Sequence, residues 1–195
     1  MPTMQPTEHL HAADDPEYVR TPAVTYVAVS GDGPPGTDVF YRKKTLVAGI
    51  AGELNDAGST PVVEIQYWYP EGSTPVEIAD FYSVNPVPSL LYRVLSQVPA
   101  GTTQTDIDTA RIQVVSAVGA TSDEVTVLSI PEQDVVQVMH HGPFAEELTT
   151  LERLGDFARR RRVRRSGPHH EIHLDAFTRS TPQDSLRTIL RDPVA

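Results

Sequence analysis

Two glutamates stand at matching places in two similar stretches of the sequence. Glu64 lies in the run Val-Val-Glu-Ile-Gln, and Glu171 lies in the run His-His-Glu-Ile-His. A carboxylate held in a site can activate a water molecule as a general base, or it can pair with a cationic ligand. We therefore take Glu171 and Glu64 as the candidate catalytic residues. The alternative is that both are exposed carboxylates on strands.

Aromatic and imidazole side chains near the two glutamates could form the walls of a site. The candidates for ligand contact are Trp68, Tyr69, Phe144, His173 and His141. Trp68 shares a strand face with Glu64 by alternation, which favours a cleft wall over a packing role. An apolar pocket with a few convergent polar groups is the usual form of a small-molecule site.

A metal site is the competing interpretation of the histidines. His169, Glu171 and His173 alternate along one strand face, and His141 could lie on a neighbouring strand. Three such ligands could hold zinc and leave one position open. The spacing is not that of a His-Glu-x-x-His helix, and histidine-rich strands are often only polar faces. We predict no metal and no cofactor.

An internal repeat predicts how these residues are positioned. Each half has a strand, a loop, a helix and a second strand, and the glycine of the loop precedes the glutamate by 33 and 29 residues. The expected elements are strands 24–29, 62–69, 135–139 and 169–174 and helices from about 37 to 54 and 145 to 162. Two such halves can share one antiparallel sheet, which gives an α+β fold with two helices on one face.

Side-chain alternation then predicts the location of the ligand cleft. Ile65 and Ile172 should face the helices, together with His170, because apolar strand faces pack against helices. Glu64 and Glu171 should lie on the opposite, helix-free face. We expect the ligand cleft on that open face.

The remaining segments carry weaker signals. Residues 1–21 have no periodic apolar pattern, and we expect a disordered lead-in before one domain that spans residues 22–195. Residues 90–98 are expected to form a short helix capped by Ser89. Residues 111–118 and 125–130 are expected to form a hairpin.

Composition excludes several classes of protein. The chain has 195 residues and no cysteine, which excludes a disulfide scaffold, a zinc ribbon and a cysteine nucleophile. The formal charge of −10 repels nucleic acid and anionic membranes. Six arginines between residues 159 and 165 fit a solvated helix end better than a nucleic-acid contact. No apolar run reaches the roughly 18 residues of a membrane span.

These features also predict the location and the partners. The polar, acidic start of the chain lacks the pattern of a secretory signal, so we expect a cytoplasmic protein. We expect a flat apolar small-molecule ligand, no nucleic acid and no membrane. The sequence leaves the oligomeric state open.

Three stretches resemble a known family. The runs QDVVQVMHHGPFAEELTTLERLGDF, HHEIHLDAFTRSTPQDSLRTILRDPV and VVEIQYWYP resemble GyrI-like small-molecule-binding proteins over roughly residues 22–194. The match is specific from residue 132 onward and looser before it. Two positions depart from the family pattern, because His173 and Phe144 stand where tyrosine is common. Roles that need those two hydroxyls do not carry over.

The resemblance implies a duplicated fold with a central ligand cleft, and it implies a function. Some stand-alone members are hydrolases that open the cyclopropane ring of duocarmycin- and yatakemycin-type DNA-alkylating natural products. They use an aromatic cage with glutamates and protect the cell. We expect this activity, in self-resistance or xenobiotic protection, because the chain before residue 22 is too short for a DNA-binding output domain. The alternative is a non-catalytic protein that binds and sequesters a drug or toxin.

Overall fold

The chain forms a curled nine-stranded sheet with three helices, which is the expected α+β class. The computed structural model describes residues 5–56, 58–118 and 122–195. The strands are β1 Gln5–Pro6, β2 Glu17–Thr21, β3 Val24–Asp32, β4 Val63–Trp68, β5 Leu91–Gln97, β6 Val125–Ile130, β7 Gln133–His141, β8 His169–His173 and β9 Arg187–Pro193. The helices are α1 Asp38–Leu54, α2 Gln104–Val118 and α3 Glu147–Arg161.

The expected duplication is visible in the strand order, which is β1-β2-β7-β9-β8-β4-β5-β3-β6. One half is β3-α1-β4-β5 and the other is β7-α3-β8-β9. The two halves meet where β4 and β8 pair in antiparallel fashion, with Ile65 opposite Glu171 and Glu64 opposite Ile172. The strands that carry the two glutamates are therefore neighbours at the centre of the sheet.

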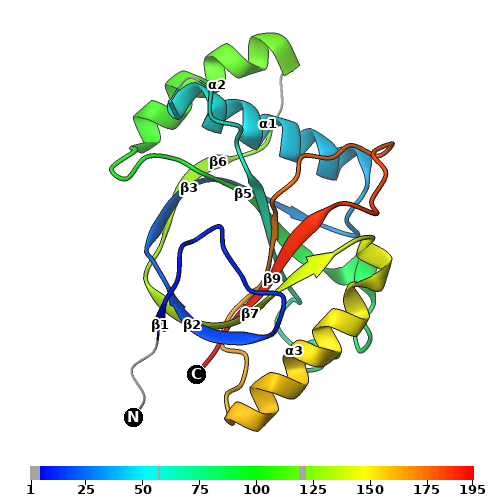
Figure 1. The fold of residues 1–195 in the computed structure, drawn as a ribbon. Coiled ribbons are helices and arrows are strands. Elements are labelled where there is room, and N and C mark those ends of the chain that lie inside the picture. Colours follow the sequence, from blue (N-terminus) through cyan, green and yellow to red (C-terminus); the bar gives the residue numbers. More distant parts are fainter. Residues whose placement is uncertain (1–4, 57, 119–121) are drawn as a thin grey trace.

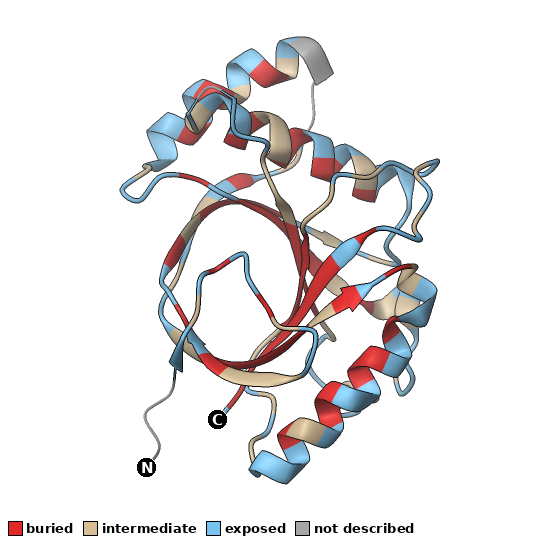
Figure 2. Cartoon of the chain, viewed as in Figure 1, coloured by how far each residue is buried: buried red, intermediate tan, exposed pale blue. Residues whose placement is uncertain are grey.

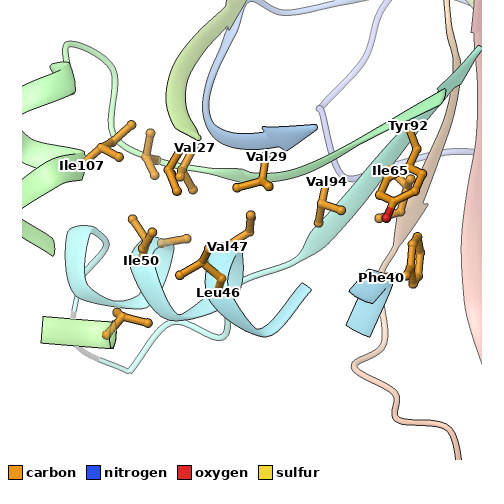
Figure 3. Close-up of a cluster of buried hydrophobic side chains, with 14 of the residues drawn as sticks. Val27, Val29, Phe40, Leu46, Val47, Ile50, Ile65, Tyr92, Val94 and Ile107 are labelled. Carbon is orange, nitrogen blue, oxygen red and sulfur yellow. The ribbon is translucent and has the colours of Figure 1, made fainter. Parts of the chain in front are cut away.

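The helices cover the outer, convex face of the curled sheet (Figure 1). Thr37 caps α1 by accepting a hydrogen bond from the backbone N–H of Phe40, at 3.2 Å. The apolar stripe of α1 packs on side chains of β3, β4 and β5 (Figure 3). In the second half, Leu151 and Leu154 of α3 pack in one cluster with Val138 of β7. Helix α2 packs on α1 and has fewer contacts with β6.

The inner face of the curled sheet is covered by the N-terminal segment, described from residue 5 to residue 21, which corrects the expectation of a disordered lead-in for that part of the chain. Residues 1–4 of that expectation lie outside the described residues. Figure 1 shows this segment crossing the inside of the sheet. Residues 17–21 form β2, which pairs with β7, and His9 and Ala12 are only 9% and 5% exposed. Buried residues line much of the inside of the sheet (Figure 2). Both faces of the central strands are therefore buried.

Two further segments differ from the sequence expectation. Residues 91–97 form the strand β5 between β4 and β3, and Ser89 ends a short 3₁₀ turn instead of capping a helix. Residues 104–118 form the helix α2, and only residues 125–130 of the expected hairpin are a strand. The central place of β5 explains the first error, because a strand with both faces buried loses its alternating pattern.

The most consequential difference concerns β8. Glu171 lies on the helix-bearing face, because it pairs with Ile65 of β4 and Leu190 of β9, which belong to the clusters under α1 and α3. Ile172 instead lies on the inner face, in a cluster with Ala12. The expectation for Glu171 was wrong because it assumed that only one face of the sheet was covered. Glu64 and Glu171 thus point to opposite faces.

Candidate functional site

A cavity of about 510 Å³ opens between the N-terminal ends of α1 and α3, above β4 and β8. It lies on the helix-bearing face, so the expectation of a cleft on the helix-free face is corrected. The lining residues are mostly apolar and aromatic: Pro35, Gly36, Phe40, Tyr41, Tyr67, Tyr82, Val87, Phe144, Ala145, Glu147, Leu148, Glu171, His173, Phe177 and Gln183. A cavity of this size and character suits a drug-sized apolar molecule.

Aromatic rings from both halves of the fold form the cavity walls. The ring centres of Phe144 and Phe177 are 4.9 Å apart, and the ring centre of His173 lies 5.4 Å from Phe144 and 5.1 Å from Phe177. On the other side, Tyr67 and Tyr82 are 6.1 Å apart. Flat faces and edges at these distances can hold a flat ligand by stacking and edge contacts.

The loop after β7 brings Phe144 to the cavity. Gly142 has a φ of 102°, a conformation that glycine adopts without strain, and its N–H donates to the carbonyl of Leu186 at 2.9 Å. The backbone N–H of Phe144 donates to Oε1 of Gln183 at 3.2 Å. The His-Gly-Pro-Phe motif therefore folds as a turn that is fixed to the segment between β8 and β9.

Glu171 is the charged group of the cavity. Its side chain is almost completely buried, yet Tyr82 donates a hydrogen bond to Oε1 at 2.6 Å, and Nε2 of His173 lies 3.2 Å from Oε2. Burial alone raises the pKa of Glu171, but the neighbouring His169 and His173 outweigh this effect and hold the pKa well below its ordinary value. The carboxylate is therefore ionised at neutral pH.

His169 supports this charge from behind. Its Nδ1 lies 3.0 Å from Oδ2 of Asp192, and its Nε2 lies 3.7 Å from Oε1 of Glu171. Burial lowers the pKa of His169, but Asp192 outweighs burial and raises the pKa to about 10. A protonated imidazole thus lies between two buried carboxylates, which is a favourable arrangement for keeping Glu171 ionised.

Glu147, at the start of α3, has a pKa that is shifted in the opposite direction. It is 5% exposed, and its Oε1 has no hydrogen-bond partner in the described part of the chain. Burial and the negative charge of Glu171 raise the pKa of Glu147 well above its ordinary value. The pKa values of the two carboxyl groups of the cavity are therefore shifted in opposite directions, and such a pair can act as base and acid.

The structure brings together three of the seven residues predicted for the site. Glu171, Phe144 and His173 line the cavity. The other four are not among its lining residues. Trp68 is half-buried under the guanidinium of Arg93, 5.4 Å from its ring.

Tyr69 and His141 lie elsewhere on the molecule. Tyr69 packs 5.4 Å from the ring of Phe81, and its hydroxyl donates to the carbonyl of Asn85 at 3.4 Å. His141 is exposed and forms an ion pair with Asp14 at 2.8 Å. Neither residue therefore forms part of the cavity wall.

Glu64 belongs to a buried network on the inner face. Its Oε1 lies 2.8 Å from Nε2 of His9, and its Oε2 lies 2.8 Å from Nε2 of His170 and accepts from Tyr26 at 3.2 Å. Burial raises the pKa of Glu64, but His9 and His170 outweigh it and lower the pKa. His170 thus faces away from the helices, contrary to expectation. This network ties the N-terminal segment to the sheet.

Sequence reasoning missed Tyr82, Glu147 and Phe177, all of which line the cavity. Tyr82 lies in an irregular segment, so no periodicity indicates its direction. The sequence does offer an indication that Glu147 belongs to the site, because Glu147 stands in the first turn of an amphipathic helix beside the Gly-Pro-Phe loop. Within the described ranges, no group of three or more histidine, aspartate or glutamate side chains is arranged to hold a metal ion.

Comparisons with known proteins show similarity in structure. No protein-family model and no curated protein sequence matches the chain. A hydrolase from Listeria innocua superposes with a TM-score of 0.74 at 20% identity, over 95% of this chain and 94% of that chain. The C-terminal domain of EcmrR superposes with a TM-score of 0.62 at 10% identity, over 93% and 97%. SAV2435, solved with tetraphenylphosphonium, gives 0.51 at 11% identity, over 93% and 94%.

These similarities extend over nearly the whole chain, and together with the duplicated strand order they decide the fold. The chain has a GyrI-like fold. At such low identities the similarity concerns the fold alone. In this GyrI-like fold, the ionised Glu171 lies where the two halves meet, between helices contributed by each half. Within the described residues, no helix has both the length and the apolar character needed to cross a membrane.

Proposed function

We propose that the protein binds a flat, largely apolar small molecule in the cavity and hydrolyses it, with Glu171 as the general base. The observation that carries this proposal is the pair of carboxyl groups that line the cavity, whose pKa values are shifted in opposite directions, down for Glu171 and up for Glu147. A base that is ionised and an acid that is protonated at the same pH are what water activation and leaving-group protonation require. The Listeria innocua protein of the same fold is named a hydrolase, which is consistent with this role.

The proposed substrate class is the spirocyclopropane of duocarmycin- and yatakemycin-type alkylators, as the sequence resemblance implies. Glu171 takes a proton from a water molecule whose oxygen attacks a ring CH₂ carbon. The C–C bond of the cyclopropane breaks, and its electron pair moves into the conjugated dienone to give a phenolate. Glu147 then donates its proton to the phenolate oxygen. The aromatic walls hold the flat substrate during this step.

The biological role follows from this chemistry. Ring opening by water removes the electrophile before it can alkylate DNA. We propose a protective function in the cytoplasm, either self-resistance or defence against a xenobiotic. The protein itself would not contact nucleic acid, because it carries a formal charge of −10.

A second candidate is a binder without chemistry. SAV2435 was solved with tetraphenylphosphonium, a lipophilic cation. An ionised carboxylate surrounded by aromatic rings suits such a ligand here as well. In this case Glu171 would be a charge partner, and Glu147 would contribute no proton transfer.

One experiment distinguishes the two candidates. The purified protein is mixed with a spirocyclopropane alkylator, and the products are followed by liquid chromatography with mass spectrometry. Conversion to the hydrated, ring-opened product by the parent protein and not by Glu171→Gln supports the hydrolase. Saturable binding without any product, in the parent as well as the variant, supports the binder and contradicts the hydrolase.

A further inference from the structure

The two lysines of the chain have different surroundings. They are Lys43 and Lys44, adjacent in α1, and the other basic residues are all arginines. Lys43 forms an ion pair with Asp123. Lys44 is only 7% exposed, and in the described part of the chain its amine has no hydrogen bond or ion pair. Its Nζ lies 3.3 Å from the ring centre of Phe177 and 5.4 Å from that of Tyr41.

Lys44 borders a second cavity that adjoins the main one. This cavity has a volume of about 300 Å³ and shares His173 and Phe177 with the main cavity. Most of the other residues that line this cavity are apolar or small, and one of them, Asp175, is acidic. They are Thr45, Ala48, Thr60, Pro61, Val62, Val63, Leu174, Asp175 and Ala176. Lys44 also lines a hollow at the surface, together with Arg179.

The environment of Lys44 favours the free amine. Burial removes water from the ammonium group and lowers the pKa of Lys44 to about 7, although Glu171 opposes this shift. An ordinary lysine with a pKa near 10.4 has only about 0.04% free amine at pH 7. A free amine is the nucleophilic form, so Lys44 has the chemical state that amine catalysis requires.

We propose that Lys44 is a second reactive site, a nucleophilic amine that condenses with a small apolar aldehyde held in the adjoining cavity. Nζ attacks the carbonyl carbon and forms a C–N bond. The carbonyl oxygen takes up protons and leaves as water, and Nζ loses both of its protons as the imine forms. The reaction needs no oxidant or reductant, and it is reversible.

The cavity supplies a group for the proton transfers. His173 lines both cavities, and its Nδ1 is buried without a hydrogen-bond partner among the described residues. Burial lowers the pKa of His173 by more than the neighbouring Glu171 raises it, so the neutral imidazole can exchange protons. Asp175 and the apolar lining favour an uncharged aldehyde over an anionic one. A single aromatic ring bearing an aldehyde fits this chemistry.

The pH dependence of the reaction is set by the groups that face Lys44. These are Glu171 and His173 from β8, Asp175 at the edge of the adjoining cavity, and the groups that line the surface hollow with Lys44, which are Asp38, Tyr41, Arg42 and Arg179. The negative Glu171 raises the pKa of the amine, but burial has the larger effect. We therefore expect Lys44 to react faster at pH 7 than Lys43, whose amine is held in an ion pair with Asp123.

Reductive trapping tests the proposal on the full chain. The protein is incubated with benzaldehyde and sodium cyanoborohydride at several pH values, and the modified peptides are mapped by mass spectrometry. We expect Lys44 to be labelled at least tenfold faster than Lys43 at pH 7, with a half-maximal rate near that pH. Equal rates for the two lysines, or a half-maximal rate near pH 10, would overturn the proposal.

Matched variants make the result specific. Lys44→Arg should abolish the fast labelling, and Lys43→Arg should leave it unchanged. If Lys44→Arg does not fold, peptide mapping in the parent still decides, because the two lysines are resolved there. Phe177→Ala should admit water to the amine and raise the pKa of Lys44, because burial is what lowers that pKa. Labelling of Lys44 in this variant should therefore be slower at pH 7 than at pH 9. Equally fast labelling of Lys44 by the anionic pyridoxal 5′-phosphate would contradict the apolar cavity as the binding site.

Discussion

Glu171 combines deep burial with a negative charge, which is costly unless donors surround the carboxylate. Tyr82 donates to one oxygen, His173 lies within hydrogen-bond distance of the other, and His169 adds a positive charge nearby. These partners stabilise the resting carboxylate, and they also orient it. A base that is held in one orientation beside an apolar cavity can direct a single water molecule at a bound substrate.

The first prediction concerns this base. Glu171→Gln keeps the shape of the side chain but cannot accept a proton. If Glu171 activates water, the variant should bind substrate with a dissociation constant close to that of the parent and lose about 10²–10⁴-fold in turnover. Single-turnover kinetics and fluorescence titration measure the two quantities separately. Glu64→Gln is the matched control, because Glu64 does not line the cavity. The folded fraction of that variant should have the same turnover rate as the parent. Equal turnover in parent and Glu171→Gln would show that Glu171 is not the base.

The second prediction concerns the acid. Burial and the charge of Glu171 raise the pKa of Glu147 well above its ordinary value, so its protonated form persists to higher pH than that of an ordinary glutamate. Glu171 has a lowered pKa and remains ionised under mildly acidic conditions. If Glu147 is the acid, the plot of kcat/KM against pH should fall on its alkaline side as Glu147 loses its proton, whereas Glu171 should cause no loss under mildly acidic conditions. Glu147→Gln should lower turnover and remove the alkaline fall. An unchanged alkaline limb in that variant would exclude Glu147 as the acid.

Single residues of the site could be predicted only in part. The matching positions of Glu171 and Glu64 led to the right strands, because a repeat places equivalent residues near the axis between the halves. The sequence could not tell which glutamate faces the cavity. The answer depends on which face of β8 the N-terminal segment covers. The contact between Ala12 and Ile172 joins residues about 160 positions apart in the sequence, so local patterns do not reveal it. Tyr82 was missed because its segment has no regular secondary structure.

At the scale of elements, the N-terminal segment is fixed by one histidine. His9 contacts Glu64 and Tyr26 through Nε2, and Arg191 donates to its Nδ1 at 3.2 Å and to its backbone carbonyl at 2.7 Å. All four side chains are at most 9% exposed. The segment that we expected to be disordered therefore completes the buried inner face.

The third prediction tests this attachment. His9→Ala removes one partner of the buried Glu64 carboxylate and leaves its charge less compensated. Losing a hydrogen bond to a buried charged group costs about 1.5–3 kcal/mol, and we expect the low end because His170 and Tyr26 remain. Urea unfolding followed by circular dichroism measures the loss. His11→Ala is the control, since that side chain is exposed and should change stability by less than about 0.5 kcal/mol. A loss for His9→Ala no larger than the control would refute the attachment.

The elements differ in how well the sequence specified them. Helices α1 and α3 were predictable, because each follows a glycine-rich or Gly-Pro loop and carries an apolar stripe. Residues 111–118, the later part of helix α2, include several β-branched residues, and the expectation of a strand there was wrong. Helix α2 does carry a start signal. The backbone N–H of Thr103 donates to Oδ2 of Asp106 at 2.8 Å, and the backbone N–H of Asp106 donates to Oγ1 of Thr103 at 3.3 Å. Strand β5 is buried by neighbours on both sides, which the local sequence does not show.

At the scale of the whole molecule, two of the three buried glutamates in the described part of the chain, Glu64 and Glu171, link stability to pH in the same direction. Both have pKa values below the ordinary value of 4.5. A carboxyl group whose pKa is lower in the folded state stabilises the fold above the pKa of the unfolded chain. That contribution is lost as the pH falls below it. The raised pKa of Glu147 acts in the opposite direction and offsets part of this effect.

The fourth prediction follows from this linkage. The free energy of unfolding should decrease as the pH falls from about 5 to 3, as measured by urea titration at each pH. Glu64→Gln removes one of the two linked groups, so the variant should be less stable at pH 7 and its stability should change less over this range. A parent whose stability is constant between pH 5 and 3 would contradict the assigned charge states.

The fifth prediction concerns the arginine-rich end of α3. The cavity lies at the first turn of this helix, and a 15-residue helix extends about 20 Å, so the arginines at its far end are remote from the ligand. The triple variant Arg160→Gln, Arg161→Gln, Arg162→Gln should therefore bind the ligand within about twofold of the parent. Isothermal titration calorimetry measures this. The comparison variant Phe144→Ala, at the cavity wall, should weaken binding by about 1–3 kcal/mol, by analogy with base stacking on aromatic side chains.

A nucleic-acid role for the same arginines predicts a different outcome. DNA binding that rests on them would weaken steeply with salt, because each phosphate contact releases counterions. The remaining surface is strongly acidic and opposes such a complex. In a filter-binding assay at low salt, we expect neither the parent nor the triple variant to retain duplex DNA. Salt-sensitive retention of DNA by the parent, lost in the triple variant, would assign the arginine-rich end to nucleic-acid binding and overturn its assignment as a solvated helix end.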